Sequence, residues 1–184
     1  MTSPLLAKAR RDGREIVTVT PERAGWTHVG FRALRLAAGD SETLDTGARE
    51  LCIVVLAGKV SVQAGGQTFS NLGTRTKVFD DAAPDALYVP SKQHVTIRAT
   101  ADAEVALCSA PCDTAPREVK RLDAASMRRS TRGQGSNTRF ICDVLPHDDP
   151  TAAHLLVVEV RTQAGHSSSY PPHKHDDSPE CPVN

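Results

Sequence analysis

The feature that most constrains this chain is a succession of short apolar runs separated by turn-forming residues. Runs of this length and spacing are typical of β-sandwiches and β-barrels. Helical periodicity is weak throughout, and the 12 glycines and 12 prolines among the 184 residues suit a fold with many turns. The sequence therefore predicts an all-β fold, with strands in its first part at residues 15–19, 31–37, 51–58, 59–64, 67–72, 85–90, 94–100 and 103–110.

Two of these segments allow more specific predictions. Residues 51–58 are almost continuously apolar, which indicates a strand covered on both faces or one deep in a sandwich. In the next strand, Val60 and Val62 should face the same way because alternate residues of a strand share a face. Gly65 and Gly66 follow it and can supply the positive φ angles of a tight hairpin turn.

The composition changes after residue 111. Residues 112–139 are rich in basic and small polar side chains, and we interpret them as a linker with one strand inside it, at 117–122. A short helical turn is expected between Asp123 and Arg128, with the aspartate as its cap. Further strands are expected at 138–145 and 153–162.

The charged residues of this second part leave two questions open. Arg128, Arg129 and Arg132 could contact an anion, although a solvated face of the linker is the favoured interpretation. Glu159 alternates with apolar neighbours in its strand, so it either faces solvent or reaches into a barrel.

Charge and composition exclude several classes of protein. The 22 basic and 22 acidic side chains give a formal net charge of zero, which argues against nucleic acid or an anionic membrane as a partner. No apolar run suits a signal peptide or a bilayer span, so a cytoplasmic location is expected. The five cysteines are expected to be free thiols, and none forms the C-x-x-C pairs of a four-thiolate zinc site.

The candidate site is the segment SYPPHKHD near the end of the sequence. His173 and His175 are two residues apart, so on an extended segment both can point the same way while Lys174 points away. Imidazoles of this kind bind Zn²⁺, Mn²⁺ or Fe²⁺. The short pattern alone also fits a polar loop without a metal.

The spacing of this segment has an echo in the first half. In the first half, Thr43 and Asp45 are two residues apart, and Glu50 follows five residues after Asp45. Near the end of the chain the same spacing separates His173, His175 and Glu180. A proline is also followed four residues later by a histidine, at Pro90 and His94.

These patterns resemble the two signatures of the cupin superfamily, H-x-H-x(3,4)-E and P-x(3)-H. The segment SSSYPPHKHD, preceded by LLVVEVRTQAG, closely resembles the 5-deoxy-glucuronate isomerases of myo-inositol catabolism. These are bicupins related to the 4-deoxy-L-threo-5-hexosulose-uronate isomerases. The segments ELCIVVLAGKVSV, ALYVP, ALCSAP and GQGSNTRFICDVLP also resemble this family.

For the fold, the resemblance implies a cupin (jelly-roll) barrel and the N-terminal half of a bicupin. Residues 1–115 would form the first barrel, which we expect to be metal-free because Thr43 and Asp45 stand where the family pattern has imidazoles. Residues 116–184 would form a connector and the start of a second, incomplete barrel. By analogy with cupins, a homo-oligomer is expected.

For the function, the resemblance implies an aldose–ketose isomerase that converts 5-deoxy-D-glucuronate, a small sugar acid, into 2-deoxy-5-keto-D-gluconate. His173 and His175 match the metal-binding positions, with Zn²⁺ or Mn²⁺ as the expected ion. We leave Glu180 out of the site because Pro179 and Pro182 flank it. No catalytic base is assigned. The family's later segments, L-E-E-x-Y-Y and P-x-G-Y-H-P, are absent here, so the remaining ligands are expected beyond Asn184 and the activity is expected of a longer protein.

Two other functions remain open. The first is a non-catalytic cupin that binds a sugar or has a regulatory role, and the second is an Fe²⁺-dependent cupin dioxygenase, against which the SYPPHKHD segment argues. His94 is expected to be structural or to lie at an interface. The remaining histidines are expected to be surface or packing residues, and Trp26 and Tyr170 to pack rather than to line a pocket; these histidines are His28, His147, His154 and His166.

Overall fold

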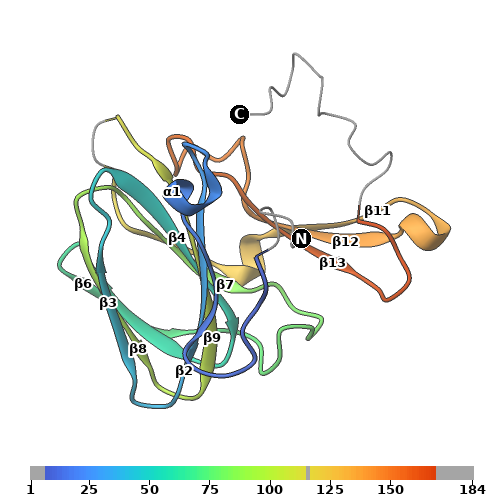
Figure 1. Cartoon of the computed structure of the whole chain (residues 1–184), viewed down its shortest axis with the longest axis horizontal. Coiled ribbons are helices and arrows are strands. Elements are labelled where there is room, and N and C mark those ends of the chain that lie inside the picture. The colour runs from blue at the N-terminus through green and yellow to red at the C-terminus, as the bar shows by residue number, and fades with distance from the viewer. Residues whose placement is uncertain (1–6, 115–116, 169–184) are drawn as a thin grey trace.

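The computed structural model describes residues 7–114 and 117–168, and it is almost entirely built of antiparallel β-sheet (Figure 1). Its first sheet has six strands in the order β1 (Glu15–Val19), β2 (Gly30–Leu36), β9 (Ala103–Pro111), β4 (Arg49–Ala57), β7 (Asp85–Val89) and β10 (Lys120–Leu122). The second has four, in the order β3 (Ser41–Asp45), β8 (His94–Ala99), β5 (Val60–Ala64) and β6 (Gln67–Leu72). The third has three, in the order β11 (Arg128–Arg132), β12 (Arg139–Leu145) and β13 (Val157–Thr162).

Helical structure within the described ranges is confined to single turns. These are the α-helix α1 (Pro21–Ala24) and the 3-10 helices η1 (Ala124–Ser126) and η2 (Gly135–Asn137). The Asp123 carboxylate accepts a hydrogen bond from the Ala125 N–H at the start of η1, which confirms the expected aspartate cap. Within the part of the chain that the structure describes, no helix has the length and apolar character that a membrane span requires.

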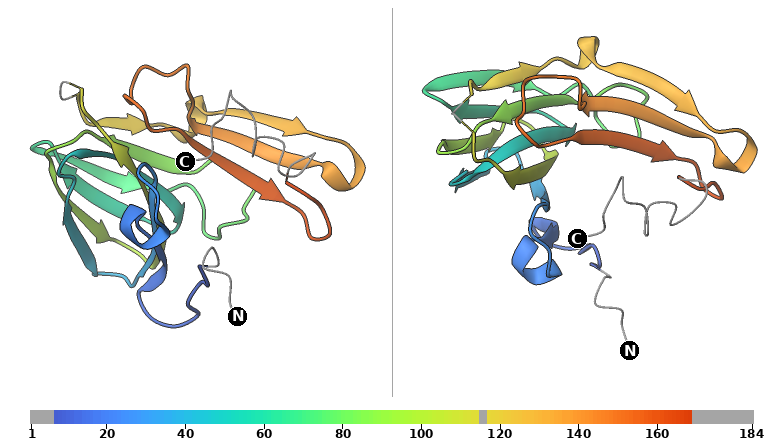
Figure 2. Two further views of the ribbon diagram at one scale, coloured as in Figure 1. Left: turned by 45° about the horizontal axis from the view of Figure 1, so that its top comes forward. Right: turned by 90° about the horizontal axis from the view of Figure 1, so that it is seen from above.

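The six- and four-stranded sheets pack face to face around an aliphatic core. The side chains of this core that are less than 2% exposed come from both sheets, and they are Leu34, Leu36, Ile53, Val55, Val60, Val62, Leu72, Leu87, Val89, Val95, Ile97, Ala99 and Val105. Burial of this apolar surface stabilises the sandwich by roughly 25 cal/mol per Å². The three-stranded sheet lies beside the sandwich (Figures 1 and 2).

A second apolar core lies on the outer face of the six-stranded sheet. Cys52 and Val54 of β4 face this core, whereas their neighbours Ile53 and Val55 face the interior of the sandwich. Val144 and Leu145 of β12 are among the residues that cover the outer face. Strand β4 is therefore covered on both faces, as its continuous apolar sequence predicts.

The predicted hairpin is confirmed. Strands β5 and β6 pair antiparallel, and Gly65 and Gly66 between them have φ angles of 58° and 73°. Positive φ at two successive residues is the requirement of a type I′ turn, and glycine meets it without steric cost. Val60 and Val62 are both fully buried, in agreement with the predicted alternation.

Two strands of the structure, β3 and β11, are not predicted from the sequence. Strand β3 is mostly polar and Leu44 is its single apolar residue, so its apolar signal is too weak to be recognised. Strand β11 lies in the segment interpreted as a linker, and the absence of a strand there is wrong because β11 pairs along its whole length with β12. Its side chains are exposed, as the favoured solvated face predicts. The sequence cannot show this pairing partner, since pairing supplies backbone hydrogen bonds regardless of side chain.

The connector is tied to the sandwich by two buried carboxylates. Asp85 of β7 accepts hydrogen bonds from the Gly73 N–H (2.9 Å) and from the Arg121 guanidinium of β10 (2.9 Å). Strand β10 belongs to residues 116–184, which we assigned to the connector and second barrel, and it forms an edge of the six-stranded sheet. The division of the chain into two barrels stays a prediction.

Glu50 is the second and more deeply buried carboxylate. Its side chain is fully buried, and its two oxygens accept hydrogen bonds from the N–H groups of Ala153 (2.9 Å), His154 (2.7 Å) and Leu155 (2.6 Å). The Tyr88 hydroxyl donates a fourth hydrogen bond at 2.8 Å. Because these three N–H groups bind a carboxylate, they do not enter a strand ladder. This explains why the strand expected at 153–162 begins only at Val157.

Burial and hydrogen bonding act in opposite directions on the ionisation of Glu50. Burial is the largest single contribution and raises the pKa of the carboxyl group, but the hydrogen bonds from Ala153, His154, Tyr88 and Leu155 together hold that pKa below its ordinary value of 4.5. Burial and the bond to Glu50 also raise the pKa of the Tyr88 hydroxyl well above its usual range. Both groups therefore keep their roles as acceptor and donor at neutral pH.

We predict that Glu50→Gln destabilises the protein by about 2–4 kcal/mol, because an amide offers one acceptor oxygen and turns its NH₂ group toward backbone donors. Equilibrium unfolding in urea measures this change. Glu104→Gln is the control: Glu104 makes a partly exposed ion pair with Arg35 at 3.1 Å, whose loss should cost below about 1 kcal/mol. Equal losses in the two variants would contradict the role assigned to Glu50.

The stabilisation from Glu50 should depend on pH in the acid range. Since the folded pKa lies below 4.5, the contribution of the carboxylate is complete above pH 4.5 and is lost as the pH falls through the folded value. The difference in unfolding temperature between the native protein and Glu50→Gln should therefore shrink below pH 4.5. A difference that stays constant from pH 7 to pH 3 would show that ionisation of Glu50 does not contribute.

Candidate functional site

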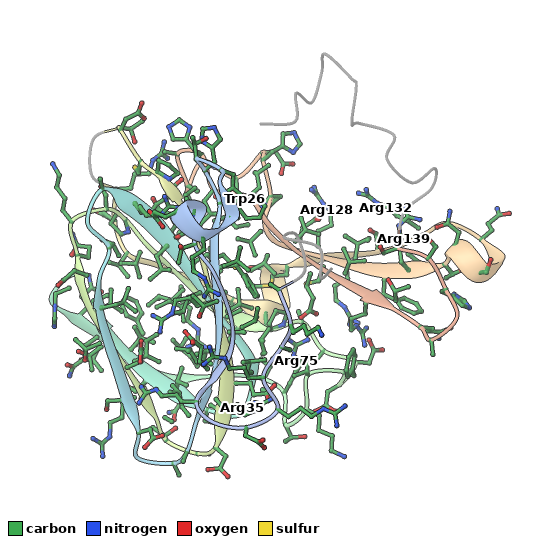
Figure 3. The ribbon with its side chains drawn as sticks, in the orientation of Figure 1. Trp26, Arg35, Arg75, Arg128, Arg132 and Arg139 are labelled. Carbon is green, nitrogen blue, oxygen red and sulfur yellow. The ribbon has the colours of Figure 1, made fainter. Side chains whose placement is uncertain are left out.

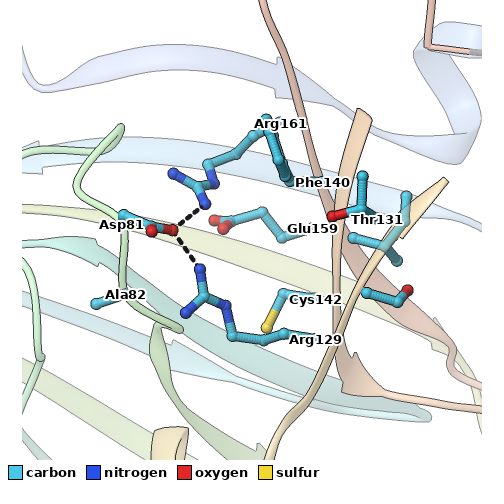
Figure 4. Close-up of a pocket in the computed structure, with 10 residues that line it drawn as sticks. Asp81, Ala82, Arg129, Thr131, Phe140, Cys142, Glu159 and Arg161 are labelled. Carbon is cyan, nitrogen blue, oxygen red and sulfur yellow. Dashed lines mark hydrogen bonds and ion pairs between the residues drawn. The ribbon is translucent and has the colours of Figure 1, made fainter. Parts of the chain in front are cut away.

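The three-stranded sheet has two distinct faces. Its register places Arg129, Cys142 and Glu159 directly opposite one another, and beside them Thr131, Phe140 and Arg161. Residues opposed in antiparallel strands share a face. This face lines a cavity of about 450 Å³ together with Asp81 and Ala82, which belong to the loop before β7 (Figure 4).

A buried ion pair joins this face to the first half of the chain. The Arg75 guanidinium donates to both Glu159 carboxylate oxygens, at 2.9 and 2.8 Å, and the Arg75 side chain is completely buried. Planar bidentate pairing of this kind is among the stronger charge-assisted contacts. The orientation of Glu159, which the sequence leaves open, is therefore toward Arg75 and the loop that precedes β7.

Asp81 bridges two arginines at the mouth of the cavity. Its carboxylate accepts hydrogen bonds from Arg161 of β13 and Arg129 of β11 (Figure 4). These two contacts, first with Arg161 and then with Arg129, lower the pKa of the Asp81 carboxyl group. The Arg161 guanidinium also lies over the Phe140 ring, 5.6 Å from its centre.

The cavity contains a thiol with little nucleophilic character. The pKa of the Cys142 thiol is raised, mainly by burial and also by the nearby Glu159 carboxylate. A raised pKa keeps the thiol protonated at neutral pH, and the thiolate is the reactive form. The cavity is thus a set of paired charges, with Arg75, Arg129 and Arg161 neutralised in part by Glu159 and Asp81.

The opposite face of the sheet is apolar at its centre, where Ile141 is buried and its neighbours on β13 are exposed. Ile141 of β12 lies opposite Val160 of β13, and Val158 is the next residue on the same face. Val158 and Val160 are 47% and 44% exposed. Apolar side chains that line one face of a sheet in this way indicate a surface that another layer or a ligand covers.

The predicted metal ligands, His173 and His175, lie outside the described residues, as do Tyr170, Glu180 and Cys181. Across residues 7–114 and 117–168, no three histidine, cysteine, aspartate or glutamate side chains come together in a group that could hold a metal ion.

The corresponding positions of the first half do not converge. Thr43 and Asp45 lie on the exposed face of β3, because the alternate residue Leu44 packs against the sandwich core. His94 of β8 lies opposite Asp45, and its Nδ1 is 2.7 Å from the Asp45 carboxylate on the solvent side. Glu50 faces the second apolar core instead and binds the connector.

The remaining histidines and cysteines of the described ranges behave as surface and packing residues. His154 pairs with Asp113 at 2.8 Å on the surface, and His166 lies 3.2 Å from the Thr138 carbonyl oxygen. His28 and His147 are exposed. Four cysteines are free thiols, as predicted: Cys52, Cys108, Cys112 and Cys142.

Sequence reasoning missed Arg75 and Asp81. Both belong to the segment between β6 and β7, which has no periodic pattern, and their partners are remote in sequence: Glu159 is 84 residues from Arg75 and Arg161 is 80 residues from Asp81. A charged residue inside a strand, as Glu159 is, signals that a partner exists. It does not identify that partner.

The fold belongs to a known class. The structure is similar to the crystal structure of an IolB-like protein from Salmonella typhimurium LT2, with a TM-score of 0.86 and 36% identity over 91% of this chain and 63% of that one. The all-β architecture expected from the sequence is confirmed, and it is the architecture of this IolB-like protein.

The family can be stated more narrowly. The family model described as "KduI/IolB family" matches residues 5–181, and the chain belongs to this family. It is 45% identical over 160 residues to the 5-deoxy-glucuronate isomerase of Halalkalibacterium halodurans and 42% identical over 158 residues to that of Bacillus subtilis. Each match covers 86% of this chain and 58% of the relative, so the chain spans about three-fifths of the length of these relatives.

The buried ion pair allows a direct test of how the cavity is held together. Glu159→Gln should destabilise the protein by about 3–5 kcal/mol, because it leaves the buried Arg75 guanidinium without a counter-charge. Thermal or urea unfolding measures the loss. Asp81→Asn removes an exposed carboxylate from the same cavity and should cost no more than about 1 kcal/mol. If the two variants are equally stable, the Arg75–Glu159 pair does not hold the cavity together.

Proposed function

We propose that this chain belongs to a 5-deoxy-glucuronate isomerase, which converts 5-deoxy-D-glucuronate into 2-deoxy-5-keto-D-gluconate. The observation that carries the proposal is the match to the KduI/IolB family over residues 5–181. Relatives that are 42–45% identical carry the name 5-deoxy-glucuronate isomerase. The reaction moves two hydrogens between adjacent carbons, from the hydroxyl-bearing carbon to the aldehyde, and it consumes no oxidant.

The proposal assigns His173 and His175 as ligands of a Zn²⁺ or Mn²⁺ ion. The donor set fits such an ion, since imidazole is a ligand of both and alternate residues of an extended segment can point to one side. A bound ion of this type supplies Lewis-acid polarisation of a carbonyl oxygen. The proposal assigns no residue as the base that moves the proton.

The architecture supports a second barrel built on the three-stranded sheet. The face with the buried Ile141 and the exposed Val158 and Val160 is apolar at its centre, as a barrel interior is, and the opposite face lines the cavity with Glu159 and Arg161. In this proposal the first barrel is metal-free, and the protein is a cytoplasmic homo-oligomer that acts in myo-inositol catabolism on a small sugar acid.

An assay of the metal-loaded protein tests the function. We expect the complete protein to form a ketone from 5-deoxy-D-glucuronate in the presence of Zn²⁺ or Mn²⁺. Carbon-13 NMR of the substrate measures the product directly. His173→Ala and His175→Ala should each weaken metal binding and lower turnover by more than about 100-fold, because loss of an outer-shell partner alone costs about 10–100-fold and these residues are proposed as direct ligands.

His94→Ala is the matched control, because His94 is an exposed histidine paired only with Asp45 on the surface of the first sandwich. Its metal content and turnover should stay within about twofold of the native protein. Metal binding without turnover of 5-deoxy-D-glucuronate would contradict the isomerase and support a non-catalytic sugar-binding cupin. Full activity in His173→Ala would remove this residue from the metal site.

A further inference from the structure

Two arginines lie directly opposite each other at one end of the three-stranded sheet. Arg132 is the last residue of β11 and Arg139 the first of β12, and they form a cross-strand pair. Like charges that face each other across two strands destabilise the sheet. They lie on the face away from the Arg75–Glu159 cavity, and Figure 3 shows Arg128, Arg132 and Arg139 together on that side of the sheet.

The other arginines of this sheet are neutralised by acidic side chains. Arg128 pairs with Asp143 at 2.7 Å and Asp148 at 3.4 Å, while Arg129 and Arg161 share Asp81. Among the described residues, no acidic side chain pairs with Arg132 or Arg139. Within residues 7–114 and 117–168, the Arg139 guanidinium donates to the neutral oxygens of Asn137 alone, at 3.1 and 3.2 Å.

The surroundings of the pair are suited to a sugar acid. Thr162 lies opposite Arg139 on the same face, and Ser130 lies one position further along it, so two hydroxyl groups flank the guanidinium groups. The apolar side chains of Ile141 and Val160 come next on this face. Hydroxyl groups can hydrogen-bond to the hydroxyls of a sugar, and apolar side chains can contact its C–H groups.

We propose that Arg132 and Arg139 bind the carboxylate of the sugar acid, with Ser130 and Thr162 beside it. This rests on the proposed function and deepens it, because it assigns the residues that select an acidic substrate over a neutral sugar. A carboxylate placed between two guanidinium groups accepts charge-assisted hydrogen bonds from both. It also removes the repulsion between them, so the cost of opposing two arginines in the free protein is recovered when the substrate binds.

Binding of D-glucuronate to the 184-residue protein tests the proposal without any need for turnover. The shifts of backbone amide NMR signals report the position and affinity of the ligand, with D-glucose as the neutral control at matched ionic strength. Glucuronate should shift the amides of residues 128–132 and 139–141 in a saturable way, and glucose should not. Arg132→Gln and Arg139→Gln should each weaken glucuronate binding about tenfold or more, the loss expected for one charge-assisted contact.

Arg128→Gln is the matched control, since Arg128 lies on the same strand and the same face but is already paired with Asp143 and Asp148. It should change the affinity for glucuronate less than about twofold. Without ligand, Arg132→Gln should raise the unfolding temperature because it removes a like-charge contact. The proposal is overturned if glucuronate produces no saturable shift at these amides, or if Arg128→Gln weakens binding as much as the other two variants.

Turnover separates this inference from the proposed function. If the metal-loaded protein isomerises 5-deoxy-D-glucuronate and neither Arg132→Gln nor Arg139→Gln raises KM, the isomerase stands and the arginine site is wrong. If glucuronate binds as expected but 5-deoxy-D-glucuronate is never converted, the arginine site stands as a carboxylate site and the proposed function is wrong.

Discussion

The arrangement of this molecule depends on one carboxylate that is cut off from water. Glu50 is fully buried in the wall of the sandwich, where an unpaired charge would be costly, and it is satisfied by three consecutive backbone N–H groups and a tyrosine hydroxyl. Those N–H groups belong to the segment that leads into β13. The hydrogen bonds to Glu50 therefore help to position β13. This strand carries Glu159 and Arg161 on one face and Val158 and Val160 on the other.

The two faces of the three-stranded sheet differ in how their charges are neutralised. On the face that lines the cavity every arginine has an acidic partner, and the Cys142 thiol is held in its protonated form. On the opposite face, apolar side chains lead to two arginines that have no acidic partner among the described residues. This difference between the faces is the observation on which the proposed carboxylate site rests.

Much of the fold could be predicted from the sequence because apolar alternation reports burial. The burial of β4 on both faces and the Gly65–Gly66 hairpin could be predicted, because each depends on residues that are neighbours in the sequence. Strand β11 could not be predicted, since exposed residues such as Arg128 carry no burial signal and its pairing is made by the backbone. In the candidate site, the sequence identified Glu159 as unusual but not its partner Arg75, because the pairing of distant residues is a property of the topology. The motif histidines, His173 and His175, stay a prediction.

The distance along the chain between Glu50 and its partners has a consequence for synthesis. The N–H groups that neutralise Glu50 come 103 to 105 residues later. While the ribosome makes these residues, the sandwich strands already exist, but the outer face of β4 has nothing to cover it and Glu50 must remain hydrated. The nascent protein therefore passes through a stage with an uncovered apolar face, a state that invites association with other chains and that chaperones protect.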